Sequence, residues 1–372
     1  MITPGRPVKD VEINSETPID KIFEELSQSG GFEAVNLSSS LEILSEMISD
    51  EKCLKFISFV GAVVSTGLRG IIKDMIKNRW FDVVITTCGA LDHDIAKHYS
   101  HYKEGSFTMD DGELAEQDIH RLGNVLVPLE SYGPLIEEKM QEFLEEEYQN
   151  GVKEMSSADI SKMIGKHLGE DSFLHWAFKN DVEVVVPGIM DGAVGSQIWM
   201  FSQKHADFKL NLISDANLLS GLIFKAEKSG SLMIGGGISK HHTLWWNQYR
   251  EGLDYACYIT TAQEFDGSLS GALVKEANKL AAENHLGLIE SKAIMPELQR
   301  MLGILGLNIP KISPEQKQEI DKMINDREML RKEKQFSEAD KIRDKLNEMN
   351  VELIDHKGKT IWMKKEKIKA DL

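Results

Sequence analysis

The chain of 372 residues is 41% hydrophobic and 28% charged, which is enough apolar material for a full core and excludes a disordered or fibrous protein. Its formal net charge of −17 argues against a main body that binds nucleic acid and favours cationic small molecules or basic partners. Its 3 widely separated cysteines, the lack of an apolar run of about 18 residues and the lack of a leader-like start predict a cytoplasmic protein without disulfides, a thiolate metal site or a membrane span.

Five short runs rich in β-branched and aromatic residues predict the strands. They alternate with longer amphipathic stretches, a pattern typical of a parallel sheet whose strands are buried on both faces. The expected fold class is therefore α/β, with helices flanking a parallel sheet. The runs occupy residues 56–60, 83–87, 182–186, 232–234 and 255–260.

Glycines and small polar residues follow most of these runs. Open α/β sheets bind ligands at the carboxyl ends of their strands, where glycine lets a backbone approach phosphate or ribose closely. The pattern predicts one crevice for a nucleotide-sized ligand, but the G-x-G-x-x-G fingerprint is absent, so the pattern does not identify the nucleotide. The segments are Gly61 with Ser65-Thr66-Gly67, Thr87-Cys88-Gly89, Pro187-Gly188 with Asp191-Gly192, and Gly235-Gly236-Gly237.

Two further regions are defined by charge. Segment 135–181 begins with acidic residues interleaved with apolar ones at helical spacing, which indicates a solvated helix face and no chemistry. Prolines 310 and 314 interrupt the helical pattern, and residues 311–372 hold 16 Lys plus Arg against 14 Asp plus Glu. We expect a domain of residues 1–310 and a helical appendage of residues 311–372.

The densest polar cluster lies between residues 235 and 268, and here the chain resembles deoxyhypusine synthase. Its Gly235-Gly236-Gly237-Ile238-Ser239-Lys240-His241-His242 and Thr261-Ala262-Gln263-Glu264-Phe265-Asp266-Gly267-Ser268 runs are close to diagnostic of that family. Residues 64–69, 86–95, 120–124 and 187–192 extend the resemblance, which covers about residues 5–275 and is closest to the archaeal branch.

The resemblance implies a Rossmann-like subunit that forms a homotetramer, with NAD and amine sites at subunit interfaces. It also implies a reaction in which NAD takes hydride from spermidine, or from a related amine such as agmatine. An enzyme lysine then captures the aminobutyl fragment, which passes to a lysine of the hypusine-bearing translation factor. Oxidising an amine requires a hydride acceptor and carboxylates that hold the remaining ammonium groups, so the chemistry suits these residues.

The residue roles implied by the resemblance fall into three groups. His241, directly after the glycine turn, is the catalytic histidine. The positions that match cofactor-binding residues are Ser65, Thr87, Gly89, Asp191, Gly236, Thr261 and Ala262. The positions that match the polyamine side are Asp92, His93, Gly267, Ser268 and Glu276.

Three nearby residues have structural alternatives. Asp94 either caps a helix that begins near Ile95 or binds a ligand. His242 is interpreted as a packed histidine rather than a catalytic one, and Cys88 as a buried small residue rather than a reactive thiol.

The sequence departs from the family at the covalent nucleophile. The family continues through Glu-Ala-x-Ser-Trp-Gly-Lys, whereas this chain has Leu280 at the tryptophan position and Ala282 at the lysine position. Lys279, one helical turn after Glu276, is the replacement candidate, with an exposed lysine as the structural alternative. The chain is then a synthase with a displaced lysine, a regulatory NAD-binding paralogue in a hetero-oligomer, or an amine-oxidising enzyme of the homospermidine synthase kind.

The tail carries a second resemblance, over about residues 326–363, to the end of cysteinyl-tRNA synthetases. The pattern predicts a two-helix hairpin closed by a small β element, with Ala339, Ile342 and Leu346 at helical spacing and Lys357-Gly358 at the turn. A structural appendage is the preferred interpretation because the tail has a net charge of only +2. The basic ending at residues 364–369 keeps RNA contact as the alternative.

Overall fold

The computed structural model describes residues 7–30, 32–262, 267–271, 314–332, 335–349, 351–356 and 359–364. The chain divides into two compact units, residues 1–288 and 289–372, which are described separately. The boundary predicted near residue 310 lies outside the described residues and stays a prediction. Within the described ranges, every helix is too short or too polar to span a bilayer.

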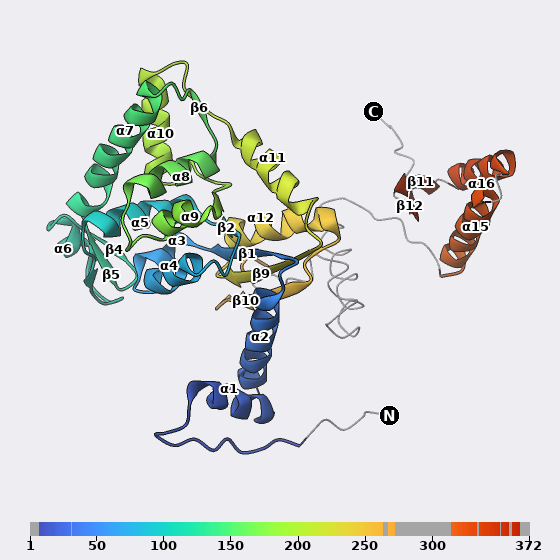
Figure 1. Ribbon diagram of the computed structural model, residues 1–372, viewed down its shortest axis with the longest axis horizontal. Helices are drawn as coiled ribbons and strands as arrows, with labels where there is room; N and C mark the ends of the chain where they lie inside the picture. The colour runs from blue at the N-terminus through green and yellow to red at the C-terminus, as the bar shows by residue number, and fades with distance from the viewer. Residues whose placement is uncertain are drawn as a thin grey trace. The chain divides into compact units, whose positions relative to one another are not determined.

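A five-stranded parallel sheet forms the centre of the first unit (Figure 1). Its strand order is β10-β9-β1-β2-β7, and every neighbouring pair is parallel. Counted along the chain from β7, this is the 3-2-1-4-5 order of a doubly wound sheet. The strands are β1 (Cys53–Phe59), β2 (Val83–Ile85), β7 (Glu183–Val185), β9 (Lys228–Ile234) and β10 (Tyr255–Ile259). Each predicted run overlaps one of them, so the α/β prediction is confirmed.

Both faces of the sheet are buried. In β1, Ile57 and Phe59 belong to the larger core cluster, whereas Phe56 belongs to a second cluster with Val185 on β7. Successive residues of a strand point to opposite faces, so one strand supplies both clusters. This two-sided burial explains why the strands appear in the sequence as nearly continuous apolar runs.

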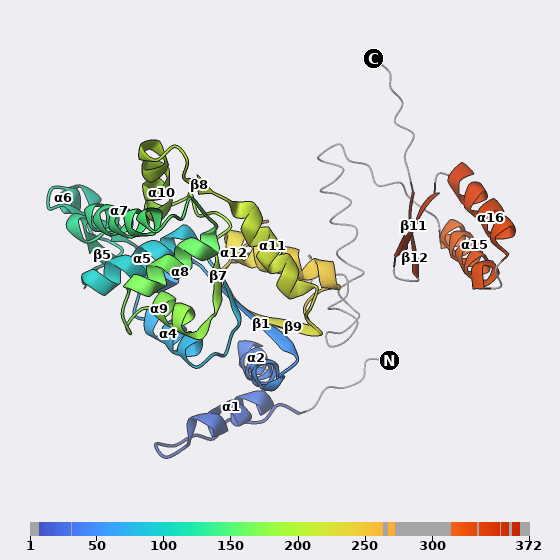
Figure 2. The same ribbon diagram turned by 45° about the horizontal axis from the view of Figure 1, so that its top comes forward.

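The helices that follow the strands cover these two faces. Helix α12 packs on β1, β2 and β9 and contacts α11, and Figure 2 shows α11 and α12 together on one side of the sheet. Elsewhere α3 packs on α5, and α4 on α9. The helices are α3 (Gly61–Ser65), α4 (Arg69–Lys77), α5 (Cys88–Tyr99), α8 (Ser157–His167), α9 (Phe173–Asn180), α10 (Ala193–Lys204), α11 (Leu212–Ile223) and α12 (Gly237–Asn247).

The acidic segment after residue 135 forms the helix that its spacing predicts. Helix α7 (Gly133–Gln149) buries Ile136, Met140, Phe143 and Leu144 and packs against α10. Its acidic residues lie on the remaining surface of the helix, as expected for an amphipathic helix.

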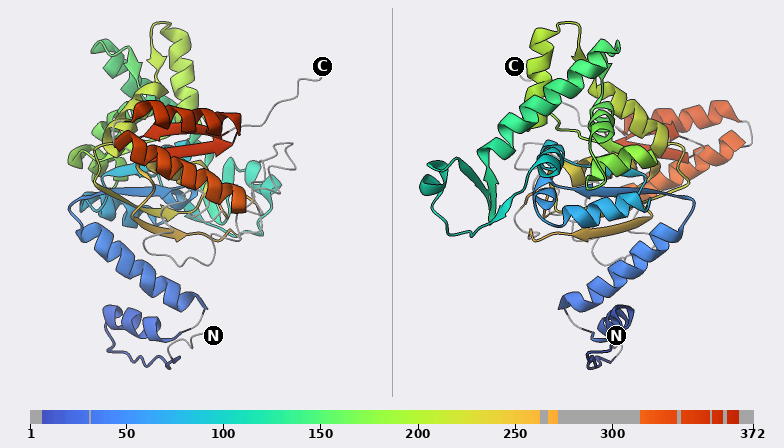
Figure 3. Two further views of the ribbon diagram at one scale, coloured as in Figure 1. Left: turned by 90° about the vertical axis from the view of Figure 1, so that its right-hand side faces the viewer. Right: turned by 60° about the vertical axis from the view of Figure 1, so that its left-hand side comes forward.

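Several peripheral elements were not predicted. An antiparallel sheet of order β3-β5-β4 extends away from the main sheet together with α6 (Figure 3), and α2 docks its buried Met47 on the edge of the sheet near Gly230. Strands β6 and β8 form a short parallel pair. The elements are α1 (Ile19–Gln28), α2 (Phe32–Ser49), β3 (Lys103–Glu104), α6 (Asp111–Ala115), β4 (Ile119–Leu122), β5 (Val125–Pro128), η1 (Leu129–Ser131), β6 (Glu154–Met155), β8 (Lys209–Leu210) and η2 (Gln248–Arg250).

The second unit is the predicted helical hairpin closed by two strands. It consists of α15 (Pro314–Lys332), α16 (Phe336–Glu348), β11 (Val351–His356) and β12 (Lys359–Lys364). The strands are antiparallel and pair His356 with Lys359, while the predicted turn between these residues lies outside the described residues. Leu346 and Val351 form a small core with Ile320 and Ile324 of α15.

Candidate active site

The site predicted from the sequence lies at the switch point of the sheet. Strands β1 and β9 are neighbours, but the chain continues from β1 toward β2 and from β9 toward β10, so a crevice opens beyond their carboxyl ends. Glycines allow close approach there: a Cβ on Gly61 would lie 2.7 Å from the carbonyl carbon of Gly89, and one on Gly235, whose φ is +81°, would lie 3.1 Å from Val60. A bulkier residue at Gly61 would separate the turns after β1 and β2, and one at Gly235 would separate the turns after β1 and β9.

Helices α5 and α12 point their amino ends at this edge. Neither Thr87, before α5, nor Gly236, before α12, caps its own helix with a side chain. Thr87 Oγ1 instead accepts a hydrogen bond of 3.0 Å from the Gly61 N–H and ties the first turn after β1 to the second. First-turn N–H groups without side-chain caps fit the phosphates of a nucleotide.

A loop after β10 lies against the start of α12. The Gly237 N–H donates to Ser270 Oγ at 3.1 Å, and Lys240 Nζ donates to the Leu269 carbonyl at 3.2 Å. These contacts bring the exposed residues Gly267 and Ser268 to the same edge of the sheet.

The remaining predicted cofactor residues also follow strand ends. Asp191 is exposed in the turn after β7, and Thr261 and Ala262 follow β10. Ser65 ends α3, is buried, and donates its hydroxyl hydrogen to the Ala62 carbonyl at 2.7 Å. All described cofactor predictions therefore lie beyond the carboxyl ends of the parallel strands.

The two histidines of α12 differ in environment. His241 is exposed, with its ring centroid 5.9 Å from that of Trp245. His242 is partly buried and accepts a hydrogen bond of 3.0 Å from Trp246 Nε1, and burial lowers the pKa of His242 to about 4. The packed interpretation of His242 agrees with this environment, and His241 is the histidine that a substrate can reach.

Asp92 is held by the protein itself. Its carboxylate is completely buried and accepts hydrogen bonds from the N–H groups of Ala193 and Val194, at 3.0 and 2.8 Å, and from the Tyr132 hydroxyl at 2.8 Å. The first two are bonds to the start of α10, so Asp92 caps that helix. Burial raises the pKa of Asp92, and the backbone donors oppose that rise.

The neighbours of Asp92 on α5 are also buried. His93 Nδ1 lies 2.9 Å from the Tyr102 hydroxyl, and burial lowers the pKa of His93 to about 4. Cys88 is a free thiol whose pKa burial raises far above its usual value. Cys88 is thus the buried small residue that the sequence suggested.

Asp94 requires a correction. Helix α5 begins at Cys88, so Asp94 lies within it and does not cap a helix that starts near Ile95. Its buried carboxylate instead accepts from the Ser172 hydroxyl at 2.6 Å and the Leu174 N–H at 3.1 Å, at the start of α9. The helix start was misplaced because Cys88 and Gly89 read as a strand-end turn, although the chain becomes helical immediately after Thr87.

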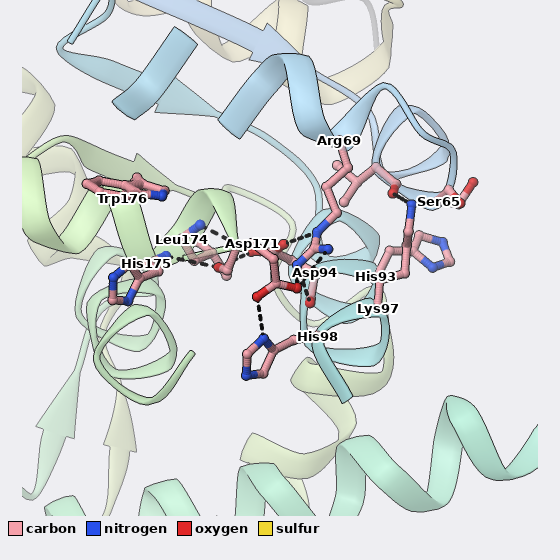
Figure 4. A network of polar contacts seen from close by, with 12 residues as sticks. Ser65, Arg69, His93, Asp94, Lys97, His98, Asp171, Leu174, His175 and Trp176 are labelled. Atoms are coloured by element: carbon pink, nitrogen blue, oxygen red, sulfur yellow. Dashed lines mark hydrogen bonds and ion pairs between the residues drawn. The ribbon is translucent and has the colours of Figure 1, made fainter. Parts of the chain in front are cut away.

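An ion-pair network that sequence reasoning missed surrounds Asp94 (Figure 4). Arg69 Nε lies 2.5 Å from the Asp94 carboxylate, and its guanidinium also reaches Asp171, which pairs with His98 Nδ1 at 2.6 Å. Beside the network, Lys97 Nζ donates to the carbonyls of Val64, Ser65 and Thr66, three successive residues that follow β1. Only the spacing of Asp94 and Lys97 on one helix hinted at this arrangement.

A hollow of about 540 Å³ lies beside this network. Its lining includes Ser65, Thr66, Gly67, Arg69, Lys97, Lys103 and Asp171. The two predicted residues Glu276 and Lys279 lie outside the described residues, so their roles stay predictions.

One cluster of metal-ligand type occurs among the described residues, away from this edge. Glu146, Glu147 and His167 approach one another on α7 and α8. Lys166 Nζ already pairs with both carboxylates, at 2.9 and 3.0 Å. The cluster is therefore satisfied as a surface ion-pair group.

The fold and the site define a doubly wound α/β protein with its candidate site residues at the switch point. The family model for deoxyhypusine synthase matches residues 21–285. The chain belongs to the deoxyhypusine synthase family, and it is a transferase of deoxyhypusine synthase-like function.

Similar proteins support this assignment. The chain is 52% identical over 274 residues to the probable deoxyhypusine synthase of Thermoplasma volcanium, covering 73% of this chain and 88% of the relative. It is 50% identical to that of Thermoplasma acidophilum over the same length and coverage. The solved structure of a protein described as a deoxyhypusine synthase in Entamoeba histolytica shares the fold, with 20% identity, a TM-score of 0.50 and coverage of 74% of this chain and 95% of that one.

Proposed function

We propose that this protein transfers an aminobutyl group from spermidine, or from a related amine such as agmatine, to a lysine of the hypusine-bearing translation factor, with NAD as cofactor. The observation that carries the proposal is the gathering of the family-matching residues at one sheet edge. Residues from the turns after β1, β2, β7, β9 and β10 all lie beyond the carboxyl ends of those strands.

The residues at this edge fit NAD. The glycine turns leave room for a backbone to approach a pyrophosphate, and the amino end of α5 offers N–H groups to its negative charge. When bound, NAD supplies the acceptor for a hydride from the amine. The residues that would hold it are Ser65, Thr87, Gly89, Asp191, Gly236, Thr261 and Ala262.

The amine would lie between α12 and the loop at residues 267–271. His241 is exposed there and would be the residue that exchanges a proton with the substrate amine. Gly267, Ser268 and Glu276 would complete the amine side. Residues 1–310 carry more than the whole formal charge of −17, since the tail is positive, which favours approach of a polycation.

Asp92 and His93 enter this proposal differently from the other residues. Because the Asp92 carboxylate caps α10, we assign it to positioning the turn at Asp191 and Gly192 rather than to direct amine contact. His93 stays in the polyamine prediction only through its place beside Asp92, on the buried side of α5.

Lys279 is the proposed covalent residue. A nucleophilic amine must be partly neutral, which requires burial or a nearby cation to lower its pKa from about 10.4. Lys275 lies four residues earlier in the sequence and would supply such a charge if the segment were helical, whereas Glu276 would oppose it. Borohydride trapping with NAD and amine, followed by peptide mapping, should label Lys279.

A control separates this assignment from labelling at other amines. Lys279→Arg should abolish the trapped adduct, whereas Lys240→Arg should leave the labelled peptide unchanged. A label on Lys240 or Lys292, or full activity of Lys279→Arg, contradicts the assignment.

One sequence observation favours a second candidate. Leu280 and Ala282 stand where the family has tryptophan and the nucleophilic lysine, as expected of an NAD-binding regulatory subunit that works with a lysine-bearing paralogue. An amine-releasing enzyme of the homospermidine synthase kind is the remaining alternative. Incubation with NAD and spermidine or agmatine distinguishes them: release of 1,3-diaminopropane or another cleaved amine supports an enzyme, and stimulation of a paralogue without cleavage supports the subunit.

The assembly and the tail complete the proposal. We propose a cytoplasmic homotetramer, or a hetero-oligomer with a paralogue, built from the domain of residues 1–310. The hairpin of α15 and α16 is proposed as a structural appendage, with RNA contact through its basic ending as the alternative. Light scattering tests the assembly, and RNA retention by the full chain at low and high salt tests the tail.

A further inference from the structure

The segment at residues 65–67 connects α3 to α4 and borders the hollow of about 540 Å³. Its far end is open: a Cβ on Gly67 would meet no atom within 4 Å, and the next residue, Leu68, is 51% exposed. Ser65, at its start, is buried and belongs to the proposed cofactor site. The hydroxyls of Ser65 and Thr66 donate to the Ala62 and Val63 carbonyls, and a neighbouring helix supplies a further interaction.

Lys97 supplies that interaction from the neighbouring helix α5. Its Nζ lies 3.0 Å from the carbonyl oxygen of Val64 and 3.2 Å from that of Ser65, and it also donates to the Thr66 carbonyl. Val64 and Ser65 lie in the last turn of α3, and the Thr66 carbonyl also accepts from the Arg69 N–H at 3.4 Å. One ammonium, with three hydrogens, thus satisfies three successive acceptors.

Without these carbonyls, the surroundings of the Lys97 ammonium would disfavour its positive charge. Lys97 is partly buried, with the Arg69 guanidinium and the neutral ring of His93 near it and the Asp94 carboxylate as the opposing charge. Burial, with the charge of Arg69, lowers the pKa of Lys97 to about 8. The ring of Tyr102 lies 6.0 Å from Nζ and adds a weak favourable contact. The carbonyl bonds offset the cost of placing a cation here.

We propose that Lys97 is a positioning residue of the cofactor site, whose ammonium fixes the backbone at residues 64–66 and thereby places Ser65 for NAD. The proposal rests on the proposed function, because Ser65 is a cofactor residue only there. Lys97 acts through the segment and has no contact with cofactor or amine assigned to it.

Lys103 offers a matched control. It lines the same hollow from β3 and is exposed, so Lys103→Met removes one positive charge from the hollow without removing a donor to residues 64–66. Lys97→Met removes the same charge together with the three donor bonds. A purely electrostatic effect on NAD binding would be similar in both variants.

The decisive measurement is calorimetric NAD affinity of the full chain. Lys97→Met should weaken NAD binding ten- to hundredfold, Lys103→Met by less than twofold, and Lys97→Gln, which keeps two amide donors, by an intermediate factor. The KM for the amine should change by less than twofold in all three variants, whereas loss of the fold would change it together with NAD affinity.

Hydrogen exchange separates failure of this proposal from failure of the cofactor assignment. In the protein without NAD, Lys97→Met should accelerate amide exchange in the peptide that covers residues 65–72 while β1 and β9 stay protected. If the wild-type protein binds no NAD, this exchange result still tests whether Lys97 fixes the backbone at residues 64–66. NAD affinity within twofold of wild type in Lys97→Met, equal losses in Lys97→Met and Lys103→Met, or failure of both Lys97 variants to fold would overturn the proposal.

Discussion

Asp92→Asn tests whether this carboxylate caps α10 or contacts the amine. The carboxylate accepts from two backbone N–H groups, of Ala193 and Val194, and from the Tyr132 hydroxyl. Asparagine keeps one acceptor oxygen and turns an NH₂ group toward the remaining donor. A buried donor left unpaired costs about 1–3 kcal/mol. We therefore expect a loss of about 1–3 kcal/mol in the free energy of unfolding.

Urea unfolding measures this loss, and Asp110→Asn is its control. Asp110 caps the exposed helix α6 through one carboxylate oxygen, which accepts from the N–H groups of Gly112 and Glu113. Water satisfies an exposed donor and asparagine is itself a good N-cap, so the control should change stability much less. Asp92→Asn should also weaken NAD binding, because α10 begins after the turn at Asp191. Unchanged stability with a raised amine KM would refute the capping role and restore direct amine contact.

Two further predictions concern buried charge. Asp94→Asn removes the partner of the buried Arg69 guanidinium and should lower the free energy of unfolding by about 3 kcal/mol. This is near the low end for a broken buried pair because Asp171 remains as a partner of Arg69. Equal stability of variant and wild type in urea would contradict the prediction. His93 and His242, whose pKa values burial lowers from 6.5 to about 4, should each contribute up to about 3 kcal/mol of stability that is complete above pH 6.5 and lost as pH falls to about 4. Thermal unfolding should show stability rising between pH 4 and 7, and the double variant His93→Asn, His242→Asn should reduce that rise. An unchanged dependence of stability on pH would show that other groups cause it.

The sequence allowed the sheet to be predicted because its strands are buried on both faces. In the runs 83–87 and 182–186, residues 83–85 and 184–186 are continuously apolar and are followed within two residues by threonine or glycine, which marks both the strand and its carboxyl end. The parallel order then places all those ends at one edge, so residues as far apart as Thr87 and Gly236 lie at the same edge without any local signal in the sequence. The two helices of the tail were predictable for a similar reason, since Ile342 and Leu346 repeat at helical spacing.

What escaped prediction depends on contacts between distant segments. Lys97, Arg69 and Asp171 come from three different helices or loops, and nothing in their local spacing shows that they share one network. The small sheet of β3, β4 and β5 has strands of two to four residues, too short for a periodic pattern to show. Asp92 was assigned to the amine through resemblance, and only the fold shows that the start of α10 occupies its oxygens.

The central claim is transfer of an aminobutyl group, and the most direct test follows an isotopic label from the amine to the acceptor lysine. The purified full chain is incubated with NAD, spermidine labelled in its aminobutyl part and the hypusine-bearing translation factor, with agmatine in a parallel reaction. The account predicts NAD-dependent label on one lysine of the factor. Label on no lysine with either amine, both for the chain alone and with a lysine-bearing paralogue added, would contradict it.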